Sequence, residues 1–121
     1  MSVNWCLFNG IDIKAGWEAA RKLASNEYTC RWYVGVTDAP LRRMEGQPQP
    51  HKWKYDCLHP LIVTREAADV ERCWIKDLTQ LLGRSRRGNN GDGGERVARG
   101  ATKFVYLCIK WQRRRVVAAT E

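Results

Sequence analysis

The sequence predicts a single α+β domain in which a small mixed or antiparallel sheet of three to four strands is flanked by helices. Segments with the two-residue alternation of strands are interleaved with segments of helical periodicity along the chain. The 121 residues, 44% of them hydrophobic, are enough for one core. No internal repeat divides residues 1–121 into smaller units.

The beginning of the chain is expected to form a strand, a helix and a second strand. Residues 3–8 predict a short strand that the Asn9-Gly10 turn ends, and residues 14–25 have the periodicity of a helix. Residues 28–37 alternate as a strand does. One face of this strand is apolar and consists of Cys30, Trp32, Val34 and Val36, whereas the other carries Arg31, Tyr33, Gly35 and Thr37.

A short helix, a strand and a long helix follow. Asp38 is a suitable N-cap for a short helix that has Pro40 in its first turn. Residues 58–64 predict a strand, and Thr64 is expected to cap a helix over residues 65–82.

The end of the chain combines basic segments with one apolar strand. Residues 84–100 are rich in Gly, Arg and Asn, which predicts a mobile basic loop. Residues 103–111 are apolar on both faces, so we expect a central strand there. A basic tail is expected over residues 112–121.

The net charge predicts a polyanionic partner. Lys and Arg number 21 against 13 Asp and Glu, a formal charge of +8. Each cation placed on a phosphate releases a condensed counterion, so nucleic acid is the favoured partner. DNA is expected rather than RNA, a preference that does not come from the charge. A basic surface that serves only solubility is the alternative.

Several features predict an intracellular protein, nuclear or cytoplasmic, that is not secreted. The five cysteines are odd in number and lack C-x-x-C spacing, which favours reduced thiols over a disulfide framework. The first ten residues lack the basic and apolar regions of a signal peptide, and no apolar stretch is long enough to span a membrane, so we expect no membrane partner. The oligomeric state is left open.

Glu71 is out of place on the predicted helix over residues 65–82. Winding the helix at about 100° per residue puts Glu71 within the apolar stripe, while the other charges face water. A carboxylate in an apolar stripe is costly unless a cation, a metal or hydrogen-bond donors compensate it. The position therefore indicates either a functional site or a buried Glu–Arg structural pair.

The stretch from Trp32 to Arg43, Trp-Tyr-Val-Gly-Val-Thr-Asp-Ala-Pro-Leu-Arg-Arg, resembles the second half of the GIY-YIG nuclease motif. In that family a YIG-like strand precedes a helix with an essential arginine, which Arg43 matches, with Arg42 as the alternative. A later helix carries a glutamate in an E-x-x-x-I/L pattern, which Glu71-Arg-Cys-Trp-Ile75 matches. The resemblance covers residues 28–111. The family's first strand, with its GIY tyrosine, is not matched, and the segment ending at Phe8 is the candidate for it.

The resemblance implies a metal-dependent endonuclease that hydrolyses phosphodiester bonds with Mg²⁺ (or Mn²⁺). Glu71 would bind the metal, and Arg43 would donate to the scissile phosphate. Tyr33, or a tyrosine from the first strand, would orient or deprotonate the attacking water, and deprotonation would need a lowered pKa of that tyrosine. His51 and Asn89, with Asn90 as the alternative to the latter, would complete the catalytic set. Gly35 would allow the phosphate backbone to approach.

Nucleic-acid binding is expected to extend over further basic side chains. The candidates are Arg31, Arg42, Arg84, Arg86, Arg87, Lys110 and Arg113. Trp53 and Tyr55, placed beside Lys52 and Lys54, are candidates for stacking on bases, with core packing as the alternative. Two other functions stay open: a catalytically degenerate nucleic-acid-binding module of the same origin, and a protein-interaction domain whose binding is insensitive to salt.

Overall fold

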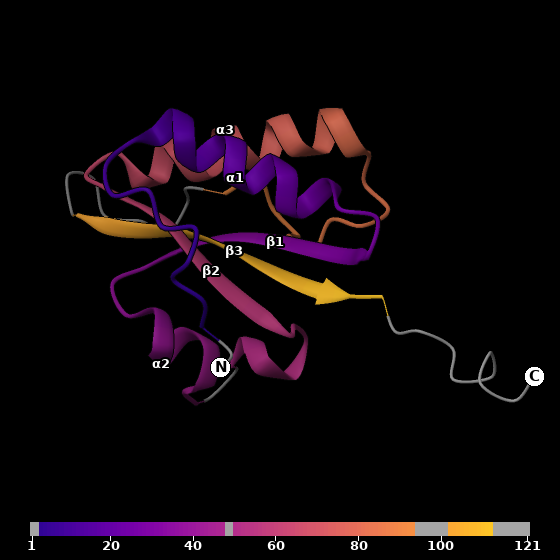
Figure 1. Ribbon diagram of the computed structural model, residues 1–121, viewed down its shortest axis with the longest axis horizontal. Helices are drawn as coiled ribbons and strands as arrows, with labels where there is room; N and C mark the ends of the chain where they lie inside the picture. Colours follow the sequence, from indigo (N-terminus) through magenta and orange to yellow (C-terminus); the bar gives the residue numbers. More distant parts are fainter. Residues whose placement is uncertain (1–2, 48–49, 94–101, 113–121) are drawn as a thin grey trace, which may run out of the picture.

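A three-stranded antiparallel sheet forms the centre of the computed structural model, which describes residues 3–47, 50–93 and 102–112 (Figure 1). The strands are β1 (Thr29–Thr37), β2 (Cys57–Thr64) and β3 (Lys103–Trp111), in the order β1-β3-β2. The predicted α+β class is confirmed. The last strand of the chain is also the central one, as its apolar faces predicted.

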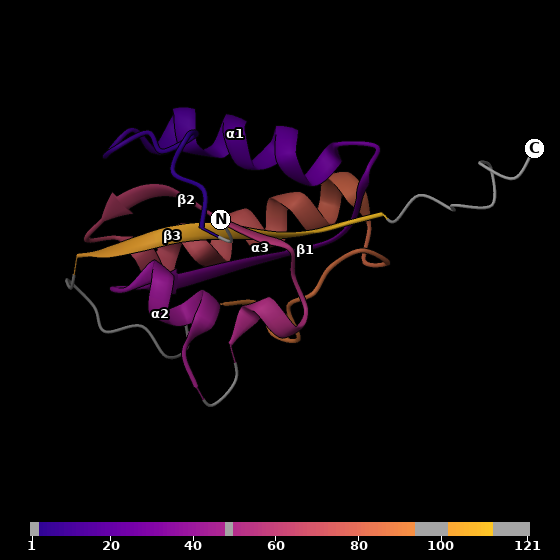
Figure 2. The same cartoon turned by 60° about the horizontal axis from the view of Figure 1, so that its bottom comes forward.

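Helices cover both faces of this sheet. The helices α1 (Ile13–Ser25) and α3 (Ala67–Leu82) lie on one face, and α2 (Pro40–Glu45) with the 3₁₀ turn η1 (His51–Trp53) lies on the other (Figures 1 and 2). Helix α1 begins at a side-chain cap, since the Asp12 carboxylate accepts a hydrogen bond from the backbone N–H of Ala15 at 3.0 Å.

The alternation predicted for the second strand is confirmed, and it places different kinds of side chain on the two faces of the sheet. Trp32 and Val34 are fully buried in the core that α1 and α3 build on the sheet. Tyr33 packs on the opposite face against a second buried cluster, which contains Val3, Met44, Tyr55, Leu58, Tyr106 and Cys108. The α1/α3 face therefore provides the main core, and the α2 face holds polar aromatic side chains.

The inward position of Glu71 is confirmed as well. Glu71 is only 9% exposed and lies on the same side of α3 as the buried Val70, Trp74 and Ile75. The helix begins at Ala67, two residues later than predicted, because the Thr64 hydroxyl accepts a hydrogen bond from the backbone N–H of Glu66 and closes a turn first.

Two local predictions are wrong. Residues 3–8 form no strand: only Val3 pairs with Leu58, in an isolated bridge, while the rings of Trp5 and Phe8 pack with Phe104. Asp38 does not cap α2, whose N-cap is Ala39 without a side-chain hydrogen bond. The Asp38 carboxylate forms ion pairs with Arg42 and Lys103 instead, at 2.9 and 3.6 Å.

The predicted mobile loop contacts the sheet in the part that the structure describes, to Gly93. Its backbone pairs with the free edge of β1: the N–H of Trp32 donates to Arg86 at 2.9 Å, and the N–H of Gly88 donates to Trp32 at 2.7 Å. Residues 86–88 therefore lie hydrogen-bonded along β1, and the mobility expected for residues 84–100 stays a prediction. Residues 94–101, and the tail from residue 113 with Arg113, lie outside the described residues.

Candidate active site

Four rings gather on the face of the sheet that α2 covers. The Tyr33 ring lies 4.7 Å from the ring of His51, 5.8 Å from that of Tyr55 and 6.3 Å from that of Tyr106, measured between centroids. The Nε2 atom of His51 and the hydroxyl oxygen of Tyr106 are 2.7 Å apart, a hydrogen-bond distance. The cluster therefore brings two tyrosines from adjacent strands together with an imidazole from η1.

Gly35 makes room for Tyr106. The two residues are directly opposite each other in the β1–β3 register, and a Cβ atom at position 35 would overlap the phenol ring and its hydroxyl oxygen. The space above Gly35, where a phosphate backbone was expected to approach, is therefore occupied by the Tyr106 side chain.

Substituting Gly35→Ala is expected to destabilise the protein by about 1–3 kcal/mol, since the new methyl group must displace the Tyr106 ring. Chemical denaturation would measure this cost. In a Tyr106→Ala background the same substitution should cost much less, because the ring is gone. Equal costs in the two backgrounds would show that Gly35 does not act through Tyr106.

His51 is held as a neutral imidazole. Burial, together with the positive charges of Arg43 and Lys54, lowers its pKa to about 4. A neutral ring keeps one nitrogen free to accept a proton. With Nε2 beside the Tyr106 hydroxyl, His51 is placed to exchange a proton with that phenol.

This pKa predicts a specific loss of stability in acid. The unfolded chain binds a proton on His51 near pH 6.5, while the folded protein resists protonation to about pH 4. Stability is therefore full above pH 6.5 and falls as the pH is lowered toward 4, with a slope of up to about 1.4 kcal/mol per pH unit for this group.

Denaturation curves of the wild type and of His51→Gln, recorded between pH 4 and 8, would test this. The difference between their unfolding free energies should shrink as the pH falls. The pKa of the buried His59 is also lowered by burial, but His59 is present in both proteins, so its contribution cancels. A pH-independent difference would contradict the assignment.

Arg43 joins the cluster through Tyr33. Burial raises the pKa of Tyr33, while the charge of Arg43 and its hydrogen bond to the phenol act in the opposite direction. The net pKa is raised, so the expectation of a lowered pKa is not met in the protein alone. Tyr33 is a neutral phenol, suited to orienting a water or a phosphate oxygen by hydrogen bonding. Arg43 itself is half-buried at the end of α2.

Glu71 reaches the same cluster from α3. Its negative charge raises the pKa of both Tyr33 and Tyr106, so the carboxylate lies within electrostatic range of the two phenols. Gly93 lies against it, because a Cβ there would come within 3.1 Å of the Glu71 Oε1 atom and 2.9 Å of Ile75. The carboxylate is thus enclosed by the end of the described loop.

The site offers a divalent cation a single carboxylate, that of Glu71. Within residues 3–47, 50–93 and 102–112, no group of three or more His, Cys, Asp and Glu side chains could surround a metal. This composition fits Mg²⁺, which keeps most of its waters and needs only one or two carboxylates plus substrate phosphates. It does not fit a fully protein-ligated structural metal.

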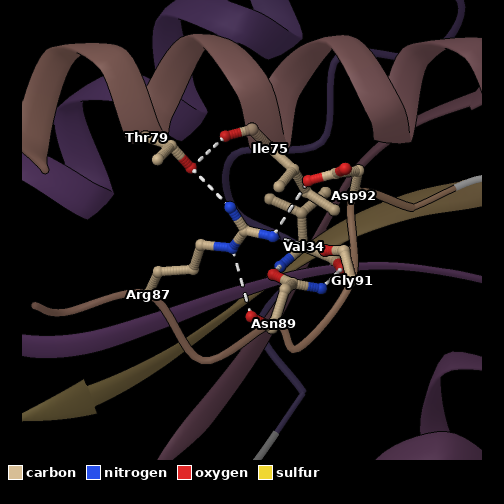
Figure 3. Close-up of polar contacts among 7 residues, drawn as sticks. All are labelled: Val34, Ile75, Thr79, Arg87, Asn89, Gly91 and Asp92. Carbon is tan, nitrogen blue, oxygen red and sulfur yellow. Dashed lines mark hydrogen bonds and ion pairs between the residues drawn. The ribbon is translucent and has the colours of Figure 1, made fainter. Parts of the chain in front are cut away.

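Asn89 and Arg87 fix the loop that encloses Glu71 (Figure 3). The Asn89 amide pairs with the backbone of Val34, accepting from its N–H at 2.9 Å and donating to its carbonyl at 2.8 Å. The Arg87 side chain is 6% exposed and donates to Thr79 on α3 and to the carbonyl oxygens of Asn89 and Gly91. Figure 3 shows the guanidinium between α3 and the loop.

These contacts change two expectations. Asn89, expected among the catalytic residues, uses both ends of its amide to extend the edge of β1. Arg87, expected to bind phosphate, is buried in the loop it organises, with an ion pair to Asp92 at 3.3 Å. Both are positioning residues, because the buried backbone and side-chain groups they satisfy would otherwise lack partners. Asn90, the alternative to Asn89, is exposed.

Replacing Asn89 by Asp should weaken the contact between the loop and the edge of β1. A carboxylate can accept from the Val34 N–H but repels its carbonyl oxygen, so we expect a loss of about 1–3 kcal/mol. Hydrogen exchange at the Val34 amide should accelerate more in Asn89→Ala than in Asn89→Asp, because only the Asp variant keeps an acceptor. Matched Asn90 variants should leave that amide unchanged. Unaltered exchange in all variants would contradict the pairing.

The other basic residues predicted to bind nucleic acid differ in their surroundings. Arg31 and Lys110 are cross-strand partners on the same face as Tyr33 and Tyr106. Arg42 is exposed beside Arg43 but paired with Asp38. Arg84 and Arg86 lie along the β1 edge, where the Arg86 guanidinium donates to the carbonyl of Thr29 at 3.0 Å. Arg31 and Lys110 thus extend the site, whereas Arg86 has a structural contact.

Sequence reasoning missed Tyr106. Its apolar neighbours made residues 103–111 look like core, and the strand is indeed buried. The available signal was the tyrosine near the middle of a strand expected to be central, where a buried hydroxyl needs a partner. Which residue would face it depends on strand pairing, which the sequence did not reveal.

No protein-family model, curated protein or solved structure matches this chain. Among the described helices none is long and apolar enough to cross a membrane. The site is therefore interpreted from its own chemistry and from the motif resemblance.

Proposed function

We propose that this chain is a metal-dependent endonuclease of the GIY-YIG type that hydrolyses phosphodiester bonds of nucleic acid, with DNA preferred over RNA. The observation that carries the proposal is the gathering of two phenols and an imidazole, with the Arg43 guanidinium hydrogen-bonded to Tyr33 and the charge of the buried Glu71 acting on both phenols. Buried polar side chains cost stability, and an enzyme that handles a charged substrate gives them a use.

Tyr106 would supply the tyrosine hydroxyl that the match to the motif lacks. The segment ending at Phe8 offers no hydroxyl and forms no strand, but Tyr106 on β3 is the diagonal neighbour of Tyr33, with the two ring centroids 6.3 Å apart. The second hydroxyl of the proposed site would come from the last strand of the chain rather than from one before Tyr33. This favours an active enzyme over a degenerate binding module.

The side chains have complementary tasks in the proposed hydrolysis. Arg43 donates to a phosphate oxygen, where its planar fork matches the charge that grows during attack. Tyr33 orients the attacking water. The water oxygen attacks phosphorus and forms a new phosphorus–oxygen bond, while the water gives a proton to the Tyr106 oxygen and the Tyr106 proton moves to Nε2 of His51. The phosphorus–oxygen bond to the leaving group breaks, and the leaving oxygen keeps the bonding electron pair and takes up a proton from solvent. A bound phosphate raises the low pKa of His51, which makes the imidazole a stronger base.

Glu71 would hold Mg²⁺ or Mn²⁺ at this site. When bound, the metal supplies stabilisation of the leaving oxygen and of the extra negative charge on phosphate. Glu71 is suited to this because it is buried and its charge acts on both Tyr33 and Tyr106.

The surface beside the cluster supports a polyanionic substrate. Arg31 and Lys110 are directly opposite each other in the β1–β3 pair, and like charges in that arrangement are destabilising. Neither forms an ion pair with a residue in the described part of the chain. A phosphate backbone lying along this face would relieve the repulsion.

Cleavage of supercoiled and branched DNA with Mg²⁺ or Mn²⁺ tests the proposal. Glu71→Gln, Arg43→Ala and Tyr106→Phe should each lower the cleavage rate by about 100-fold or more, since each removes a group that acts in the transition state. Arg72→Ala is the matched control: it removes an exposed arginine next to Glu71 that pairs with Asp69 on the surface of α3, and its rate should stay within about threefold of the wild type.

Folding of every variant would be checked by circular dichroism and thermal melting. If well-folded wild type binds DNA with an affinity that falls steeply with salt yet cleaves neither DNA nor RNA, the chain is a binding module without chemistry. If binding is absent, or insensitive to salt, a protein-interaction domain replaces both.

A further inference from the structure

Trp53 is exposed although the turn that carries it is firmly held. The indole residue is 62% exposed at the end of η1. Its neighbour His51 is 7% exposed and bonds to Tyr106, and Tyr55 is 5% exposed and packs near Tyr33. The backbone N–H groups of Lys54 and Tyr55 both donate to the carbonyl of His51, at 2.9 and 2.8 Å. The turn is fixed from both sides, and the indole of Trp53 is left exposed between two residues whose neighbours are buried.

The surroundings of Trp53 are positively charged. Lys52 and Lys54 flank it and are exposed, and the charge of Lys54 is felt by His51 in the site. An exposed indole forgoes the stabilisation that burial of its apolar surface would contribute. Lysines on both sides are unsuited to an apolar protein partner, whose interface cores are depleted in charge. They suit a ligand that combines a flat apolar ring with phosphate.

Trp5 shows the contrast. It is the other strongly exposed tryptophan, at 47%, but its ring packs edge-to-face with Phe8 and Phe104. Its sequence neighbours from Val3 to Phe8 carry no charge. Trp53 therefore differs from Trp5 in two features other than exposure. It is flanked by two lysines, and it lies on the same turn as His51 of the site.

We propose that Trp53 stacks on an unpaired base of the nucleic acid near the scissile phosphate. His51 and Trp53 are the two ends of the three-residue turn η1, so the indole begins from the same short segment that brings His51 to Tyr106. Bases inside a duplex are already stacked, so a surface indole gains only from an exposed one. The substrate class is then single-stranded or locally unpaired nucleic acid. The position relative to the phosphate rests on the proposed nuclease function; the stacking does not.

Binding in EDTA tests stacking apart from cleavage. Fluorescence anisotropy would compare a labelled single-stranded oligonucleotide with its duplex for the wild type, Trp53→Ala, Trp53→Phe and Trp5→Ala. We expect Trp53→Ala to weaken single-strand binding by about tenfold or more, Trp53→Phe to retain part of it, and Trp5→Ala to leave it unchanged. Duplex affinity should change by less than about threefold in every variant.

A scan with abasic sites sharpens the test. Removing one base at a time should reveal a position whose loss weakens binding to the wild type but not to Trp53→Ala, because the two deletions remove the same contact. Unchanged single-strand affinity in Trp53→Ala, or an equal loss for single strand and duplex, would overturn the stacking role. Stacking without metal-dependent cleavage would reject the nuclease alone, and cleavage without a Trp53 effect would reject the stacking alone.

Discussion

The pairing of Gly35 with Tyr106 across β1 and β3 is the constraint on which the site depends. A side chain at position 35 would fill the space of the phenol, so the glycine allows Tyr106 to lie over the sheet with its hydroxyl at His51. The β1–β3 register therefore decides which groups meet. A shift by one residue would move Tyr33 and Tyr106 to opposite faces and disperse the cluster.

The cluster also shows how polar groups are accommodated at low cost. The Tyr106 hydroxyl is buried, yet it lies at hydrogen-bond distance from a histidine that burial and nearby cations keep neutral. The phenol of Tyr33 bonds to Arg43, whose charge offsets part of the desolvation. On the edge of β1 that does not pair with β3, the Asn89 amide satisfies the backbone N–H and carbonyl of Val34, which an edge strand leaves open, and the Arg87 guanidinium donates to carbonyl oxygens of the loop itself. The same contacts hold the loop against Glu71.

Patterns within one element could be read from the sequence, whereas contacts between elements could not. The stripe on α3 located Glu71, and the alternation along β1 separated Tyr33 from the core, because both depend only on the period of the backbone. Tyr106 was hidden because its role depends on which strand faces β1. The strand expected over residues 3–8 failed because its aromatic rings pack on Phe104 instead of alternating across a sheet. The resemblance to the nuclease family singled out Asn89, but its partner, the backbone of Val34, could not be anticipated.

Paramagnetic broadening by Mn²⁺ tests most directly whether these groups form one metal-binding site. The chain has four tyrosines, so a ring-labelled sample gives a small, assignable NMR spectrum. With a short oligonucleotide present, Mn²⁺ at low stoichiometry should broaden Tyr33 and Tyr106 strongly and the exposed Tyr28 little, and Glu71→Gln should abolish the effect. Equal broadening of Tyr28, or broadening that survives Glu71→Gln, would contradict the site.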